Sequence, residues 1–287
     1  MSGENMLREL QDIRRASAPE CGTKAACLGE LTSLGYLVPP GLVVSTRAYE
    51  SFLRGSSLHD VARALSEESL TASPARLVAI QDEIARAFAG AALDAGLVAQ
   101  IRRWMDRFDA GVFAVRSSAT NEDLPGASFA GQYDSFLNVD PARVPQAVIG
   151  CFASLFNARA ALYRRRKNMP GMGAMAVLVQ PMVASDHGGV VFTRAPRRDH
   201  AMLIECAPGG NDGVVGGRAT PNRYYLDRAT LRVEESSERH AIDWACVRAA
   251  ADQALAIEAV FARAQDVEYA VARNTIHILQ ARPAKAS

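Results

Sequence analysis

The sequence has no strong charge imbalance, and this absence excludes several classes of binding protein. Its 32 Lys and Arg residues nearly balance its 31 Asp and Glu residues, which leaves a formal net charge of +1. A general nucleic-acid binder, or a protein that binds membrane surfaces, needs an excess of basic residues. We therefore expect neither a nucleic acid nor a membrane as a partner.

The sequence also lacks a long apolar segment and a cysteine pattern. No apolar run approaches the roughly 20 residues that a membrane-spanning helix needs, and the N-terminal MSGENMLRELQDIRR is too polar for a signal peptide. The five cysteines are odd in number and include no CxxC pair, so we expect free thiols rather than disulfides or a structural zinc site. These features predict a cytoplasmic protein.

Several common catalytic and nucleotide-binding motifs are absent as well. The chain contains no lysine-bearing P-loop, no dinucleotide-binding GxGxxG, no nucleophile elbow GxSxG and no zinc-binding HExxH. Its five histidines are scattered, so we expect them to be structural. If the chain binds ATP, it does so with a fold that uses none of these motifs.

The residues that are present indicate an anion site between Arg116 and Val139. An apolar segment at residues 111–115 is predicted to be a buried strand that leads into it, and residues 136–139 a strand that leads out. Between them lie a fixed positive charge, several hydroxyl groups and a small-residue loop, including Arg116, Ser117, Ser118, Thr120, Ser128 and Gly131. These groups are suited to binding a phosphate.

The sequence predicts helices and strands arranged in two lobes. A break near residues 169–173 predicts lobes at residues 1–170 and 171–287, and one or two helical turns are expected within residues 1–15. We expect the strands at 176–180 and 188–193 to pair as a hairpin. Helices are predicted at 25–34, twice within 75–108, from Pro141 to about Lys167, and at 241–264; further strands are predicted at 42–44, 202–206, 224–227, 266–271 and 275–280.

The last two predicted strands carry a candidate metal site. Glu268 and Gln280 fall at positions that pair across an antiparallel hairpin, where side chains lie close together on one face. Oxygen ligands of this kind suit Mg²⁺, which is commonly bound by one or two of them together with nucleotide phosphates. Taken alone, Glu268 is also compatible with a solvated glutamate on a strand. Lys24 taken alone is compatible with an ordinary surface lysine.

Six blocks of sequence, in order along the chain, resemble the N-terminal ATP-binding domain of the phosphoenolpyruvate synthase and pyruvate phosphate dikinase family, which includes rifampin phosphotransferase. The blocks extend over nearly the whole chain. They are GTKAACLGE at 22–30, VPPG at 38–41, the segment from Val115 to Val139, VQPMV at 179–183, GVVFT at 189–193, and Glu268 with LQARP at 279–283.

This resemblance implies an ATP-grasp fold, in which two α+β lobes clamp ATP. It implies that Lys24 and Arg116 hold phosphates and that the loop at 126–131, with Ser128 and Gly131, covers them. It places Gln180 and Met182 at the adenine edge and Glu205 on the base or ribose side. It assigns Glu268 and Gln280 to Mg²⁺ and brings Arg282 toward the transferred phosphoryl group.

The resemblance further implies an ATP-dependent phosphotransferase whose acceptor is a histidine domain on a separate chain or a small molecule. An ATP-grasp ligase acting through an acyl phosphate, and a non-catalytic ATP-binding partner subunit, are the alternatives. The chain departs from the family at residues 209–212, where an expected glutamate is missing, and no swivelling phosphohistidine domain follows Pro283. Met1 and the short tail favour a free-standing domain over a fragment of a longer protein.

Overall fold

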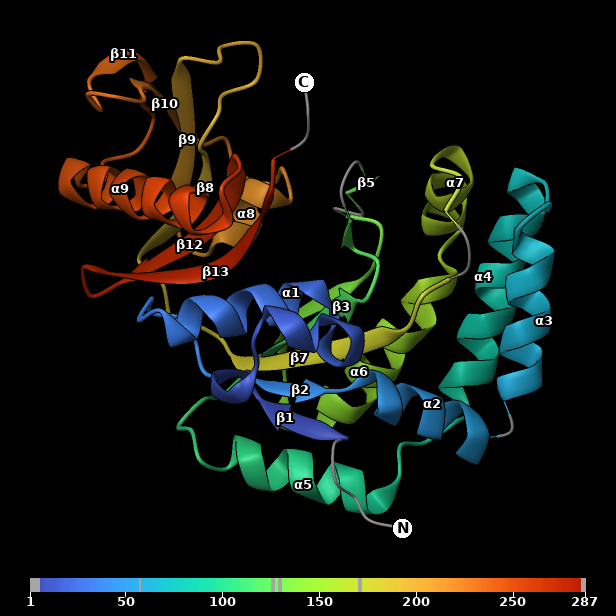
Figure 1. The fold of residues 1–287 in the computed structure, drawn as a ribbon. Coiled ribbons are helices and arrows are strands. Elements are labelled where there is room, and N and C mark those ends of the chain that lie inside the picture. The colour runs from blue at the N-terminus through green and yellow to red at the C-terminus, as the bar shows by residue number, and fades with distance from the viewer. Residues whose placement is uncertain (1–5, 57, 125–126, 129–130, 170–171, 285–287) are drawn as a thin grey trace. The chain divides into compact units, whose positions relative to one another are not determined.

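A computed structural model of the chain describes residues 6–56, 58–124, 127–128, 131–169 and 172–284 (Figure 1). The chain separates into two compact units, Met1–Gly29 with Pro40–Met182, and Glu30–Pro39 with Val183–Ser287. The expected lobe boundary at residues 170 and 171 lies outside the described residues. The changeover between the compact units follows Met182, so strand β7 (Met175–Pro181) belongs to the first unit.

The first unit is built on a five-stranded antiparallel sheet in the order β1-β2-β7-β3-β6. The strands are β1 (Leu7–Glu9), β2 (Leu42–Val44), β3 (Phe113–Ala119), β6 (Ser135–Val139) and β7. Strand β7 is buried from Met175 to Gln180, as its nearly continuous apolar run predicts for a strand covered on both faces.

Seven helices of the first unit cover this sheet or pack beside it in the described residues (Figure 1). They are α1 (Ala18–Ser33), which continues into the second unit, α2 (Thr46–Gly55), α3 (His59–Ser69), α4 (Pro74–Ala89), α5 (Ala95–Met105), α6 (Val144–Ala153) and α7 (Ala158–Arg166). One core joins the helices, apart from α1, to the sheet residues Val115, Val177 and Val179.

Helix α4 shows why these segments fold as they do. Ser73 caps its N-terminus by accepting a hydrogen bond from the Arg76 backbone N–H at 3.2 Å, and Pro74 occupies the first turn. Its apolar residues recur at helical spacing, and all four are 1% exposed: Leu77, Ile80, Ile84 and Phe88. Burying a side chain of this size contributes roughly 1.5–3 kcal/mol, so this face holds the helix against the core.

The second unit is built on a six-stranded antiparallel sheet in the order β11-β10-β9-β8-β12-β13. The elements are β8 (His187–Phe192), β9 (Ala201–Pro208), α8 (Asn211–Val215), β10 (Asn222–Asp227), β11 (Val233–Ser237), α9 (Trp244–Phe261), β12 (Gln265–Ala272) and β13 (Thr275–Pro283).

The predicted hairpin of residues 176–180 with 188–193 is wrong. Strand β7 pairs with β2 and β3 in the first unit, whereas β8 pairs with β9 and β12 in the second. Gly189 lies where β8 runs beside β9, and a Cβ built there would lie 2.1 Å from the Glu205 carbonyl oxygen. The backbones of β8 and β9 therefore approach each other at a position where only glycine fits.

Two helix predictions are also corrected. Residues 7–9 form strand β1, and 3-10 turns follow it at Leu10–Asp12 and Arg15–Ser17 in place of the expected helical turns. The single helix predicted from Pro141 to Lys167 is broken before α7, at Asn157, whose amide donates to the Gln132 carbonyl oxygen (3.2 Å) and to Asp134 Oδ1 (3.1 Å).

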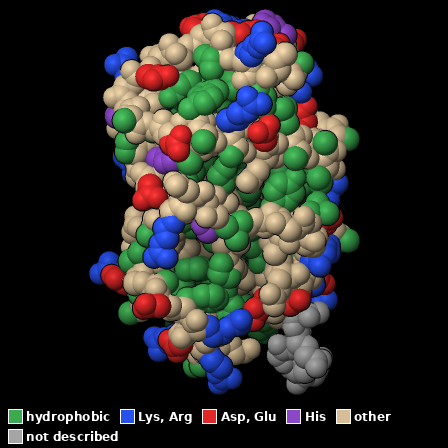
Figure 2. Space-filling model, turned by 90° about the vertical axis from the view of Figure 1, so that its left-hand side faces the viewer, with side chains coloured by type: hydrophobic (Ala, Val, Ile, Leu, Met, Phe, Trp, Pro, Cys, Tyr) green, Lys and Arg blue, Asp and Glu red, His purple; other side chains and the backbone are tan. Residues whose placement is uncertain are grey.

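The surface and the helices give two further observations. Figure 2 shows one face of the molecule, on which basic and acidic side chains are interspersed among hydrophobic ones, in keeping with the net charge of +1. None of the helices in the described part of the chain has the length and apolar character needed to cross a membrane.

Candidate functional site

The approach of α1 to the first sheet depends on Gly22. This residue has φ +73° and kinks the helix, and a Cβ built there would lie 1.8 Å from the Ser118 carbonyl oxygen. Such a backbone conformation favours glycine, and the missing side chain lets the two backbones meet. The Thr23 hydroxyl donates to the Ala119 carbonyl oxygen at 3.3 Å, which fixes the helix beside the end of β3.

Ser118 ties the two segments together with its hydroxyl. Its Oγ donates to the Cys21 carbonyl oxygen at 2.8 Å and accepts from the Ala25 backbone N–H at 3.0 Å. Both contacts satisfy backbone groups at the kink of α1, which would otherwise be buried without a partner. The Ser118 side chain therefore marks the face of β3 that α1 covers.

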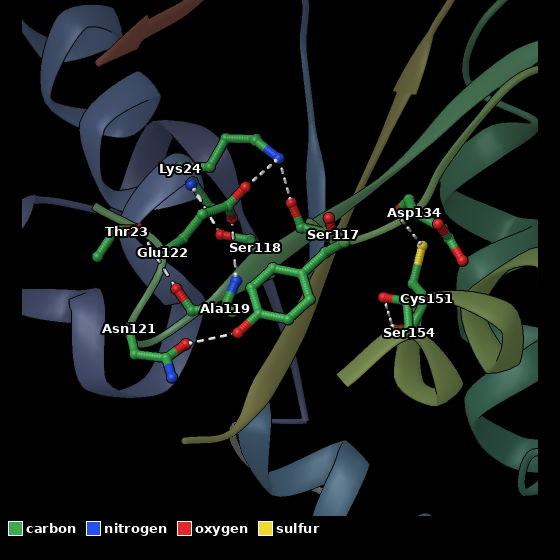
Figure 3. Close-up of polar contacts among 12 residues, drawn as sticks. Thr23, Lys24, Ser117, Ser118, Ala119, Asn121, Glu122, Asp134, Cys151 and Ser154 are labelled. Atoms are coloured by element: carbon green, nitrogen blue, oxygen red, sulfur yellow. Dashed lines mark hydrogen bonds and ion pairs between the residues drawn. The ribbon is translucent and has the colours of Figure 1, made fainter. Parts of the chain in front are cut away.

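Lys24 lies in the first unit as a buried charge with two partners (Figure 3). Its side chain is 5% exposed, its Nζ donates to the Ser117 carbonyl oxygen at 2.5 Å, and it lies 3.1 Å from Glu122 Oε1. The second carboxylate oxygen of Glu122 accepts from the Ala119 backbone N–H at 3.3 Å. A buried ammonium group needs a paired, hydrogen-bonded counter-charge, and Glu122 supplies it.

Arg116 lies in the middle of β3, because that strand continues to Ala119 instead of ending at Val115 as expected. It is half-buried, with Leu178 of β7 and Ser135 of β6 as its neighbours in the sheet. Side chains alternate between the faces of a strand, so Arg116 points to the same face as Ser118. Lys24 of α1 and Arg116 therefore lie on one face of the first sheet.

Gln180 shares this face. It is the sheet partner of Ala114, whose parity in β3 is that of Arg116, and its side chain is buried at 3% exposure. Met182 lies just beyond the strand, where its backbone N–H donates to the Val112 carbonyl oxygen at 3.1 Å. The structure thus groups Lys24, Arg116 and Gln180, while the adenine contact assigned to Gln180 and Met182 stays a prediction.

The loop predicted to cover the phosphates is described only in part. Residues 125–126 and 129–130 lie outside the described residues, and Ser128 belongs to a short strand, β5 (Ala127–Ser128), paired with β4 (Asp123–Leu124). Gly131 has φ +72°, a conformation that favours glycine. The phosphate contact of this loop remains a prediction.

A buried tyrosine holds the turn that follows β3. The Tyr133 hydroxyl donates to Asn121 Oδ1 at 3.1 Å, and the Asn121 amide donates to the Met172 carbonyl oxygen at 3.1 Å. Burial raises the pKa of Tyr133 to about 12, so the phenol keeps the proton that it donates. This bond fixes the segment that carries Glu122.

The hairpin of β12 and β13 brings the predicted metal ligands together, as expected. Glu268 and Gln280 are direct sheet partners, and their exposures are 6% and 8%. Asp266 pairs with Arg282 two residues along on the same face, with 3.4 Å between Arg282 Nε and Asp266 Oδ2. The strand register therefore places four polar side chains on one face of the second sheet.

Glu205 lies in the same row of the sheet. Successive pairings join Glu205 to Val190 and Val190 to Glu268, so their side chains share one face. The Glu205 carboxylate forms an ion pair with Arg223, with 2.8 Å between Oε1 and Nε. Its predicted contact with the base or ribose stays a prediction, but the register groups it with Glu268 and Gln280.

Sequence reasoning missed Asn211, at the start of α8. Its side-chain amide donates to Glu268 Oε2 at 3.1 Å. It also missed the role of Glu122, whose partner Lys24 is remote in the sequence. Polar residues at helix starts and acidic residues after strands are common. The local sequence around Asn211 and Glu122 therefore did not indicate their partners.

The donor set of the second unit fits a hard cation. No cluster of three His, Cys, Asp or Glu side chains that could hold a metal occurs in the described residues. The sheet instead offers the Glu268 carboxylate and the Gln280 amide, both buried. Mg²⁺ takes one or two such oxygen ligands and completes its shell with water and phosphate, whereas zinc prefers nitrogen and sulfur ligands.

Comparison with known proteins gives a consistent result. A family model described as "Pyruvate phosphate dikinase, AMP/ATP-binding domain" matches residues 18–241. The probable phosphoenolpyruvate synthase of Methanothermobacter thermautotrophicus is 32% identical over 318 residues, covering 98% of this chain and 46% of that protein. The rifampicin phosphotransferase of Streptomyces sviceus is 33% identical over 314 residues, covering 98% of this chain and 36% of that protein. The chain thus spans less than half the length of these curated relatives.

Among solved structures, the D-alanyl-alanine synthetase A of Vibrio cholerae O1 biovar eltor superposes with a TM-score of 0.35 at 10% sequence identity. The superposition covers 66% of this chain and 47% of that one. Overlap of this extent assigns neither a fold nor a function by itself.

Proposed function

Because the chain belongs to the family of pyruvate phosphate dikinase AMP/ATP-binding domains, we propose that it is an ATP-dependent phosphotransferase that uses Mg·ATP. The family match over residues 18–241 is the observation that carries this proposal. Membership brings with it the ATP-grasp fold expected from the sequence, and the two mixed units of helices and antiparallel sheet fit that α+β class.

The first unit would supply the cations that bind phosphate. Lys24 and Arg116 share one face of its sheet, where Lys24 is held by Ser117 and Glu122. Phosphoryl transfer is catalysed largely by positioning and by neutralising charge on the phosphates. In this proposal the loop with Ser128 and Gly131 covers the phosphates. Gln180 and Met182 contact the adenine edge.

The second unit would hold the metal. Glu268 and Gln280 are the proposed Mg²⁺ ligands, and Glu205 in the same row contacts the base or ribose. When bound, the ion neutralises phosphate charge. Arg282 is proposed to approach the transferred phosphoryl group, and Asp266 orients its guanidinium group.

The acceptor is proposed to lie outside this chain. The curated relatives are more than twice as long as the region they share with it, and we propose a histidine-bearing swivelling domain on a separate chain as the acceptor. A small-molecule acceptor is the other candidate, and the name of the Streptomyces relative, rifampicin phosphotransferase, is in keeping with it. We place the protein in the cytoplasm.

Analysis of the nucleotide product tests the proposal. The protein is incubated with Mg·ATP, alone and with candidate acceptors, and the nucleotides are separated by chromatography. Production of AMP supports a dikinase, and ADP supports a kinase or a ligase acting through an acyl phosphate. Tight ATP binding without turnover under every condition contradicts the phosphotransferase and favours a binding subunit, which the altered loop at 209–212 would suit.

A further inference from the structure

Within the described residues, the Asn211 side chain connects the altered 209–212 loop to the hairpin of β12 and β13 by a hydrogen bond. Its Nδ2 donates to Glu268 Oε2 at 3.1 Å, and Glu268 is 6% exposed. Both residues belong to the second unit. A hydrogen bond to a buried carboxylate is among the stronger polar contacts, so it restricts the orientation of the Glu268 side chain.

The backbone holds Asn211 in place independently of this bond. A Cβ built at Gly188 of β8 would lie 2.8 Å from the Asn211 backbone nitrogen, so the strand passes close beneath the first residue of α8. The Gly209 N–H donates to the Asp186 carbonyl oxygen at 2.9 Å. Val214 of α8 packs on Val190, the sheet neighbour of Glu268. The amide is therefore presented to Glu268 by a fixed backbone.

We propose that Asn211 is a positioning residue that orients Glu268 for a divalent cation, an inference that rests on the proposed function. A carboxylate has two oxygens, and a bond that fixes Oε2 also fixes the direction in which Oε1 is presented. Partners of this kind behind a metal ligand commonly change metal affinity about 10–100-fold when they are removed. Because the Asn211 nitrogen donates to the carboxylate, the proposal assigns the amide the role of orienting the ligand rather than that of a ligand.

Binding of Mn²⁺ to the full chain tests this inference without a readout of turnover. Mn²⁺ is titrated by electron paramagnetic resonance in the presence of a non-hydrolysable ATP analogue. We expect Asn211→Ala to weaken Mn²⁺ binding about 10-fold or more, while affinity for the analogue without metal is unchanged. Gln253→Ala, on α9 of the same unit, is the matched control and should bind Mn²⁺ like the wild type.

Asn211→Asp tests whether the N–H donor of the side chain is needed for Mn²⁺ binding. It also provides a second variant if Asn211→Ala does not fold. It keeps the shape of the side chain, removes the N–H donor and places a second carboxylate beside Glu268. A positioning role predicts weaker Mn²⁺ binding in this variant, whereas binding as tight as in the wild type or tighter would show that the N–H donor is not needed and overturn the inference. Equal Mn²⁺ affinity in the wild type and both variants also overturns it and leaves the proposed function standing. Absence of Mn²⁺ binding in the wild type overturns the proposed function itself.

Discussion

At the scale of single residues, charge burial sets the strongest constraint on the first unit. The Lys24 and Glu122 side chains are 5% and 7% exposed and lie 3.1 Å apart. Each is tolerated because the other is present, and the Ser117 carbonyl oxygen and the Ala119 N–H satisfy further hydrogen bonds. Loss of either partner would leave an unpaired buried charge, so the pair constrains the fold around the residue that is proposed to bind phosphate.

Replacing Glu122 by Gln should destabilise the protein by about 3 kcal/mol, since it leaves a buried ammonium group without a counter-charge. Urea unfolding followed by circular dichroism measures this loss. The double variant Lys24→Met/Glu122→Gln should lose less than the sum of the single changes, because no unpaired charge remains. Strictly additive losses would show that the two charges do not depend on each other.

Gly22 gives a second prediction at this scale. Gly22→Ala places a Cβ 1.8 Å from a backbone oxygen, and relief of that clash requires α1 or β3 to move. We expect a loss of about 4 kcal/mol or more, together with loss of nucleotide binding. Gly35→Ala is the matched control, because Gly35 has φ +86° with nothing within 4 Å of the added Cβ. It should lose only about 1–2 kcal/mol, and similar losses at both sites would contradict the close approach.

At the scale of elements, the break between α6 and α7 shows how one polar residue reshapes a predicted helix. Asn157 is 6% exposed and is the residue before α7. Its amide holds the segment before β6 through Gln132 and Asp134, and Arg159 also contacts Asp134. The break therefore joins α7 to the strand that runs beside Arg116.

Asn157→Ala should destabilise the protein by about 2 kcal/mol, because two hydrogen bonds are lost and buried acceptors remain. The free energy of unfolding from urea titration provides the measurement. Gln100→Ala changes an exposed amide on α5 and should stay within about 0.5 kcal/mol of the wild type. If Asn157→Ala changed the free energy of unfolding no more than Gln100→Ala does, the break between α6 and α7 would not depend on the asparagine.

The local sequence pattern predicted those elements well whose structure depends on residues close together in the sequence. The helical spacing of Leu77 to Phe88 and the pairing of Glu268 with Gln280 were both confirmed. The pairing partners of strands were harder to predict from the sequence. Strands β7 and β8 both carry apolar runs, and contacts between residues distant in sequence determine which sheet each strand joins. The same holds for the site, where the types Lys, Arg and Glu were visible in the sequence, but the partners Glu122 and Asn211 were not.

At the scale of the whole molecule, the proposed site residues divide between the two units. Lys24, Arg116 and Gln180 belong to the first, and Glu205, Glu268, Gln280 and Arg282 belong to the second. Each group lies on one face of its own antiparallel sheet.

Arg116→Ala and Glu268→Gln should each abolish turnover and leave the fold intact. A Mg²⁺ complex of an ATP analogue at about 100 times its Kd should stabilise the wild type by about 2.7 kcal/mol, and both variants should lose most of this gain. Thermal unfolding with and without the complex measures the effect, and far-UV circular dichroism checks the fold. Turnover at the wild-type rate in either variant would contradict the assignment of that residue to the site.

The second unit is not a continuous stretch of chain. Residues Glu30–Pro39, the end of α1 and the segment after it, belong to it, and the Leu37 carbonyl oxygen accepts from the N–H of Ile278 in β13. A gene cut after Met182 would therefore separate the hairpin of β12 and β13 from a segment encoded about 150 codons earlier. A single stretch of gene that carries the whole second unit would have to span residues 30–287, and it would bring Arg116 and Gln180 of the first unit with it.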